Sequence, residues 1–118
     1  QNDKELSSFV HALVDYTTDC SDYNDNHLPM EDVFSKCQKT RTCLDGEDSC
    51  DYLERVVEEI MDETWPVGKE WPNKGYSLTI IEKGEEILNL QKGNSTGNFK
   101  EYSDSINLDS EVNLKIYS

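Results

Sequence analysis

Apolar residues recur at helical spacing over residues 4–19, the first stretch of the chain with a regular pattern. They occupy positions i, i+3, i+4, i+7 and i+8, the spacing that gives a helix one apolar face. These residues are Leu6, Phe9, Val10, Leu13 and Val14. The pattern predicts an amphipathic helix that ends before the turn-forming residues 22–26.

Two further helices are predicted before residue 65. Pro29 suits the first position of a helix, and the residues after it predict a short helix over about 30–39. Asp48 or Ser49 suits the N-cap of a third helix, which Trp65 and Pro66 end. The apolar face of this third helix comprises Tyr52, Leu53, Val56, Val57, Ile60 and Met61. Its polar face comprises Asp51, Glu54, Glu58, Glu59, Asp62 and Glu63.

The pattern changes after residues 66–75, a connector that contains prolines, glycines and a tryptophan. Apolar and polar residues then alternate over 76–80 and 112–116, as they do in strands with one buried face. Residues 86–90 and 105–109 are shorter strand candidates. The second half of the chain is therefore predicted to form a small antiparallel sheet.

Helices followed by strands indicate the α+β class. We expect three disulfide-stapled N-terminal helices, within residues 1–65, packed on a small four-stranded antiparallel C-terminal sheet, within residues 76–118. The apolar faces of the first and third helices are the natural cover for one face of that sheet. The whole chain, residues 1–118, is expected to form a single domain.

All four cysteines lie in the first half of the chain: Cys20, Cys37, Cys43 and Cys50. An even number in a chain of 118 residues predicts two disulfides, and three pairings are open. A zinc site is the weaker reading, because the chain has no C-x-x-C pair and its two histidines lack zinc-finger spacing. Free thiols are the remaining alternative. Two disulfides of about 2–4 kcal/mol each would help a chain of low hydrophobic content to hold a core.

Cysteine usage also indicates a compartment. Disulfides persist outside the cytosol, so we expect a secreted protein or one of a secretory-granule lumen. Asn94 begins an Asn-Ser-Thr acceptor sequence for glycosylation in a turn-like stretch. Gln1, in place of an initiator methionine, suggests a mature N-terminus after signal cleavage. No apolar run approaches the ~18 residues of a membrane span.

Negative charge is concentrated in the first half. Residues 1–65 carry 17 of the 25 acidic residues and 5 of the 11 basic ones, in a chain of net charge −14. Nucleic acids and anionic membranes would repel such a chain, so neither is expected as a partner. A basic protein partner, self-assembly and divalent cations stay open. The simpler alternative is that the acidic residues only keep the protein soluble.

No pattern of residues predicts catalysis. The chain lacks a G-x-S-x-G motif, and neither His11 nor His27 has a nucleophile at an indicative spacing. Acidic pairs such as Glu58 and Glu59 are too numerous to single out two catalytic carboxylates. The glycines are scattered through turns and form no phosphate-binding loop. We therefore expect no enzyme and no cofactor, with calcium as the one candidate ligand.

The candidate calcium site is a loop with alternating oxygen donors. Asp22, Asn24 and Asn26 resemble positions 1, 3 and 5 of an EF-hand loop. The resemblance ends there, because His27 stands in place of the expected glycine and Val33 in place of the expected glutamate. A looser calcium site remains open, and the alternative is a turn rich in Asp and Asn that caps the next helix.

The second half resembles one Greek-key motif of the βγ-crystallin family. Residues 76–84 are similar to the first strand and turn of that motif, and residues 104–117 to its closing pattern, with a serine before the third strand. The resemblance implies that Ser105 belongs to a calcium site with acidic or amide residues a few positions earlier, where this chain has Lys100 and Glu101.

Three functions follow in order of preference. The first is a secreted non-enzymatic protein that acts by protein–protein contact or assembly, with the acidic face of the third helix as its interaction surface. The second is a calcium-responsive structural or granule-matrix protein. The third is a small secreted hydrolase, which would need a pocket where a histidine meets a buried carboxylate.

Overall fold

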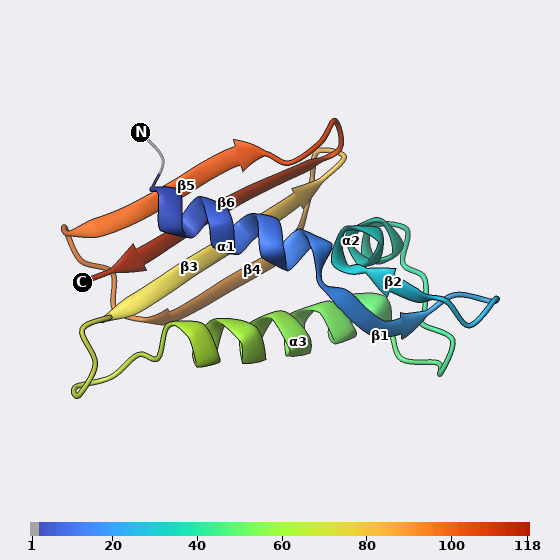
Figure 1. The fold of residues 1–118 in the computed structure, drawn as a ribbon, viewed down its shortest axis with the longest axis horizontal. Helices are drawn as coiled ribbons and strands as arrows, with labels where there is room; N and C mark the ends of the chain where they lie inside the picture. Colours follow the sequence, from blue (N-terminus) through green and yellow to red (C-terminus); the bar gives the residue numbers. More distant parts are fainter. Residues whose placement is uncertain (1–2) are drawn as a thin grey trace.

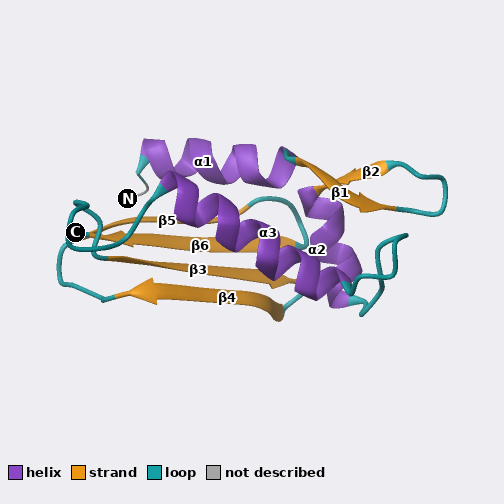
Figure 2. Ribbon diagram, turned by 90° about the horizontal axis from the view of Figure 1, so that it is seen from below, coloured by secondary structure: helices purple, strands orange, loops and turns teal. Residues whose placement is uncertain are grey.

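The computed structural model describes residues 3–118 as two layers, in which three helices cover one face of an antiparallel sheet (Figure 2). Gln1, from which a mature N-terminus is expected, lies outside the described residues. The molecule is elongated, with extents of 45 × 29 × 21 Å. A small hairpin extends past one end of the sheet (Figure 1). No helix among residues 3–118 is long and apolar enough to cross a membrane.

The three helices are α1 (Lys4–Asp15), α2 (Met30–Gln38) and α3 (Ser49–Thr64). Asp3 caps α1 by accepting a hydrogen bond from the Leu6 N–H, at 3.1 Å. Asp48 caps α3 in the same way, since its Oδ1 accepts from the N–H groups of the second and third residues of the helix. These caps satisfy backbone donors that have no partner within the helix.

The sheet contains β3 (Gly75–Glu82), β4 (Glu85–Gly93), β5 (Phe99–Ser105) and β6 (Ser110–Tyr117). The strand order is β4-β3-β6-β5, and every neighbouring pair is antiparallel. Two hairpins, β3–β4 and β5–β6, are thus joined through β3 and β6. Helix α1 packs near β5 and α3 near β4, so the two longest helices cover opposite edges of the same face (Figure 2).

One hydrophobic core lies between the layers and includes residues from both halves of the chain. Alternate strand residues such as Leu78, Ile80 and Leu114 point into it and are fully buried. Their neighbours on the opposite face are polar, as at Thr79, which pairs with Asn113. A sheet with one covered face is expected to alternate in this way.

The expected fold of three disulfide-stapled helices on one sheet is wrong in two respects. The described chain has six strands in two sheets, because a hairpin of β1 (Thr17–Ser21) and β2 (His27–Pro29) separates α1 from α2. Its two disulfides leave α1 unlinked, so α1 is held by the core and by contacts such as the ion pair between Glu5 and Lys100. The helix expected to continue toward residue 19 stops at Asp15, because the β-branched residue Thr18 bonds across the hairpin to the Leu28 carbonyl, at 2.7 Å.

The strand expected over residues 105–109 is also misplaced. Strand β5 runs from Phe99 to Ser105, and the next residues form the turn into β6. Asn107 Oδ1 accepts hydrogen bonds from the N–H groups of Asp109 and Ser110, both at 2.8 Å. An asparagine that bonds to the backbone two or three residues ahead favours a turn over a strand.

A buried carboxylate at the end of β3 gives a first prediction. Glu82 is buried, and its Oε1 accepts a hydrogen bond from the hydroxyl of Ser110, its cross-strand neighbour. Replacing Ser110 by alanine removes this donor, so we expect the free energy of unfolding to fall by about 1–3 kcal/mol. Urea denaturation measures the change. The exposed Ser105→Ala is the matched control, and an equal loss in both variants would contradict the role given to Ser110.

Candidate functional site: the exposed acidic face of α3

The sequence of α3 divides the helix into two faces. Its buried residues are Ser49, Tyr52, Leu53, Val56, Val57 and Met61. The opposite face exposes five of the six predicted contact residues: Asp51, Glu54, Glu58, Glu59 and Glu63. We call these five residues the acidic face. Four of them line a shallow concavity of about 350 Å³ together with Arg55.

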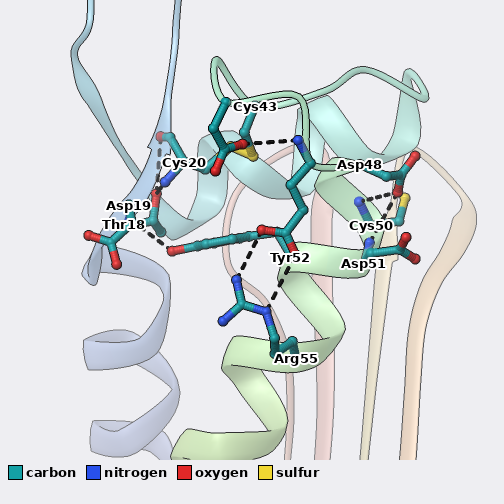
Figure 3. A network of polar contacts seen from close by, with 11 residues as sticks. Thr18, Asp19, Cys20, Cys43, Asp48, Cys50, Asp51, Tyr52 and Arg55 are labelled. Carbon is teal, nitrogen blue, oxygen red and sulfur yellow. Dashed lines mark hydrogen bonds and ion pairs between the residues drawn. A yellow bond between two sulfur atoms is a disulfide. The ribbon is translucent and has the colours of Figure 1, made fainter.

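One cation, Arg55, lies beside the acidic face, and its charge is paired with Glu47. Arg55 Nη2 donates to Glu47 Oε1 at 3.0 Å, and its Nε donates to the other oxygen of the same carboxylate at 3.4 Å (Figure 3). The guanidinium also lies over the Tyr52 ring, 5.3 Å from its centroid. The hydrogen bond and the charge of Glu47 raise the pKa of Arg55. Arg55 is thus paired with Glu47 and is also attracted by Glu59. Within residues 3–118 no cation lies within ion-pair distance of the acidic face.

Asp62, the sixth predicted contact residue, points toward the sheet. Its carboxylate accepts a hydrogen bond from the Tyr76 hydroxyl and pairs with Lys92 Nζ, both at 2.7 Å. Burial raises the pKa of Asp62, but the hydrogen bonds from Lys92 and Tyr76 outweigh it and hold the pKa below its ordinary value. Burial and the bond to Asp62 raise the pKa of Tyr76. Asp62 therefore joins α3 to β3 and β4. The helix sequence gave no signal for this, because Lys92 lies 30 residues further along the chain.

The lowered pKa of Asp62 predicts a pH dependence of stability. The stability from the ionised carboxylate is complete above the ordinary pKa of 3.8 and is lost as the pH falls through the lower pKa of the folded protein. We expect Asp62→Asn to be less stable than the wild type at neutral pH and to approach it below about pH 3.8. Thermal melting across this range measures the difference. A difference that stays constant down to pH 2 (about two units below the reference value) would contradict the linkage.

Two disulfides fix the N-terminal end of α3, and the prediction that the four cysteines form two disulfides is confirmed. Cys37–Cys50 joins α2 to α3, and Cys20–Cys43 joins β1 to the loop before α3 (Figure 3). The Tyr52 hydroxyl accepts a hydrogen bond from the Asp19 N–H at 2.8 Å, which links α3 directly to β1. The acidic face is therefore carried on a helix that is held at its N-terminal end by covalent bonds and along its length by the core.

The predicted calcium loop closes the β1–β2 hairpin. Asp22 Oδ1 accepts hydrogen bonds from the N–H groups of Asn24, at 2.9 Å, and Asn26, at 3.1 Å. The bond from Asn26 is the largest cause of the lowered pKa of Asp22. Among residues 3–118 no group of three or more histidine, cysteine or acidic side chains is placed to hold a metal ion. The structure thus gives Asp22 a structural role in the turn, and calcium binding by Asp22, Asn24 and Asn26 stays a hypothesis.

Neither histidine meets a buried carboxylate. His11 is exposed on α1, with its Nδ1 2.8 Å from the Ser7 carbonyl one turn earlier. His27 Nδ1 lies 2.9 Å from the Thr18 carbonyl and 4.0 Å from Asp19, whose side chain is 94% exposed. A general base needs a positioned partner and a site shielded from water. The described residues place neither histidine in such a site.

Asn94, the predicted glycosylation site, is exposed in the connection between β4 and β5. Its backbone N–H donates to the Lys74 carbonyl at 2.8 Å, so the loop is anchored to the sheet while the side chain is open to solvent. The Thr96 hydroxyl of the same acceptor sequence lies within hydrogen-bonding distance of the Asn98 and Ser118 carbonyls. The Asn94 side chain is exposed, and its glycosylation stays a prediction.

No protein-family model, curated protein or solved structure matches this chain. Function must therefore be inferred from surface chemistry. The acidic face offers several carboxylates without ion-pair partners on a fixed helix, and such a surface attracts cationic groups.

Proposed function

We propose that this is a secreted, non-enzymatic protein that acts through contact with a basic protein partner, and that the acidic face of α3 is the contact surface. The observation that carries the proposal is the set of five exposed carboxylates that no cation of residues 3–118 pairs with. Basic side chains of a partner would supply that missing charge. Complementary charge of this kind speeds association and selects partners.

The way α3 is held also supports the proposal. A side chain on a fixed helix loses less freedom on binding than one on a loop, so more of each contact appears as affinity. The Cys37–Cys50 disulfide, the Asp48 cap and the ion pair from Asp62 to Lys92 each restrain α3 without using the acidic face. The restraint and the contact surface are therefore independent.

Secretion is supported by the two disulfides, which are uncommon in reducing compartments. The net charge of −14 supports the choice of a basic protein over nucleic acid or an anionic membrane. Self-assembly is a form of the same proposal, in which a second copy of the chain supplies the basic side chains that contact the acidic face.

A charge-matched pair of variants tests the proposal. Glu54→Gln, Glu58→Gln and Glu59→Gln together should weaken binding of a fluorescent deca-lysine peptide about tenfold, because three exposed ion pairs are lost. The control removes the same charge from exposed glutamates elsewhere, with Glu70→Gln, Glu86→Gln and Glu111→Gln.

Fluorescence anisotropy measures both variants at about 50 and about 200 mM salt, where screening should weaken binding to the wild type. Equal weakening in the two triple variants would show that net charge, and not the acidic face, attracts the peptide. Binding that does not depend on salt would also reject the proposal.

A further inference from the structure

A groove beside the β1–β2 hairpin is lined by more cations than carboxylates. It lies between the hairpin turn, the C-terminal end of α2 and the loop that follows. Two adjoining cavities, of about 330 and 320 Å³, share Asp22, Lys36 and Arg41 in their walls. The walls also include Lys39, Tyr23 and Leu44. We call it the hairpin groove.

Three cations meet at the hairpin groove in a strongly acidic protein. Lys36, Lys39 and Arg41 lie within six residues, and none of them forms an ion pair with the described part of the chain. Arg55, Lys92 and Lys100, in contrast, each have a carboxylate partner. A cation in the last turn of a helix complements the helix dipole, which accounts for Lys36. Lys39 and Arg41 lie beyond the last turn of α2, so the helix dipole alone does not account for three cations in this place.

The walls of the groove carry three cations against two carboxylates, Asp22 and Asp32, and Lys36 and Asp22 attract each other. Asp22 also accepts hydrogen bonds from two N–H groups of its own turn, which hold its carboxylate in place. Physiological salt screens exposed charges beyond about 8 Å, so acidic residues elsewhere on the protein reduce this local excess of positive charge only in part. Locally, the groove is therefore suited to an anionic ligand, although the protein as a whole is not.

Exposed apolar side chains lie beside the cations. Tyr23 is 95% exposed and Leu44 is 51% exposed, and both line the groove. Tyrosine and arginine are enriched where proteins bind proteins, because they combine apolar contact area with a polar group. An apolar contact beside cations favours an acidic peptide over an inorganic anion or a sulfated sugar.

The walls of the groove are held in place. The Cys20–Cys43 disulfide and the hydrogen bond from the Leu44 N–H to the Ser21 carbonyl, at 3.0 Å, join the loop to β1. The buried Ser49 hydroxyl donates to the Arg41 carbonyl at 2.6 Å, which fixes the backbone beneath that side chain. A preformed groove binds at a lower entropic cost than a flexible one.

We propose that the hairpin groove binds an acidic peptide segment of a protein partner, with an apolar or aromatic residue of that segment against Tyr23 and Leu44. The proposal does not depend on the acidic face, which has the opposite charge and a different partner. It implies that the protein contacts two surfaces at once, a basic one through α3 and an acidic one through the groove.

The test uses a fluorescein-labelled oligoglutamate peptide with one central phenylalanine. Binding to the wild type is expected, and Lys36→Gln, Lys39→Gln and Arg41→Gln together should weaken it about tenfold. The matched control removes three other exposed cations, with Lys69→Gln, Lys74→Gln and Lys83→Gln, and should bind nearly as the wild type does. Tyr23→Ser, at a position too exposed to affect folding, should also weaken binding.

Three results would overturn the proposal: no binding of the peptide to the wild type at low salt, equal weakening in the two triple variants, or unchanged binding in Tyr23→Ser. Heparin that binds the groove while the peptide does not would assign the site to a sulfated glycan. Glu54→Gln, Glu58→Gln and Glu59→Gln together should not weaken binding of the acidic peptide, which separates this proposal from that for the acidic face.

Discussion

Replacing Cys20 and Cys43 together by alanine is expected to lower the free energy of unfolding by about 3 kcal/mol. The disulfide spans 23 residues and restrains the unfolded chain over that length. Both cysteines are also buried in the core. The hairpin has little other covalent or apolar attachment, because its loop is polar and its tip is exposed. Urea denaturation without reductant measures the change through the shift of the midpoint.

The second disulfide provides the comparison. Cys37–Cys50 spans 13 residues, so Cys37→Ala with Cys50→Ala is expected to cost slightly less, still about 3 kcal/mol. A loss below about 1 kcal/mol for either pair would show that packing, and not the disulfide, holds this end of the molecule. The unfolding of each variant should remain a single transition if the layers share one core.

Leu53→Ala is expected to lower the free energy of unfolding by about 4 kcal/mol, the largest effect of a single substitution considered for this protein. Leu53 lies on the buried face of α3 and has no exposed surface. Its replacement loses apolar contacts and leaves a cavity that the fixed helix closes only in part. The measurement is urea denaturation at neutral pH, with intact disulfides.

Leu108→Ala is the matched control, because the same change is made at a fully exposed position in the β5–β6 turn. We expect its effect to stay within about 0.5 kcal/mol. The control also tests the corrected end of β5 at Ser105. If residues 105–109 formed a strand on the covered sheet, Leu108 could pack against the core and its replacement would cost stability. Similar losses for Leu53→Ala and Leu108→Ala would contradict the described packing.

Periodicity predicted those elements whose burial is one-sided. The apolar face that includes Tyr52, Leu53 and Met61 was predicted correctly, because a helix that packs on a core needs apolar residues at that spacing. All three residues are buried. Strands β3 and β6 were predicted from alternating residues, because one face of their sheet is covered and the other is not. Strand β5 was missed because Tyr102 is its only buried residue, so its sequence hardly alternates.

Contacts between distant residues were not predictable from local patterns. The β1–β2 hairpin depends on pairing across the loop, such as Thr17 with Pro29 and the bond from Thr18 to the Leu28 carbonyl, in a stretch whose composition indicates only a turn. The exposed positions of Glu54 and Glu58 followed from their place opposite the apolar stripe. The inward position of Asp62 did not, because it depends on Tyr76 and Lys92 in the sheet. The cations of the hairpin groove were hidden by the large net negative charge.

The location of a basic ligand on the protein tests the central claim most directly. In a two-dimensional NMR titration of isotope-labelled protein with deca-lysine, we expect the largest backbone shifts at Asp51, Glu54, Glu58 and Glu59, with reversal on addition of salt. Shifts spread evenly over the surface, or concentrated on the open face of the sheet, would show that the acidic face of α3 is not the contact surface.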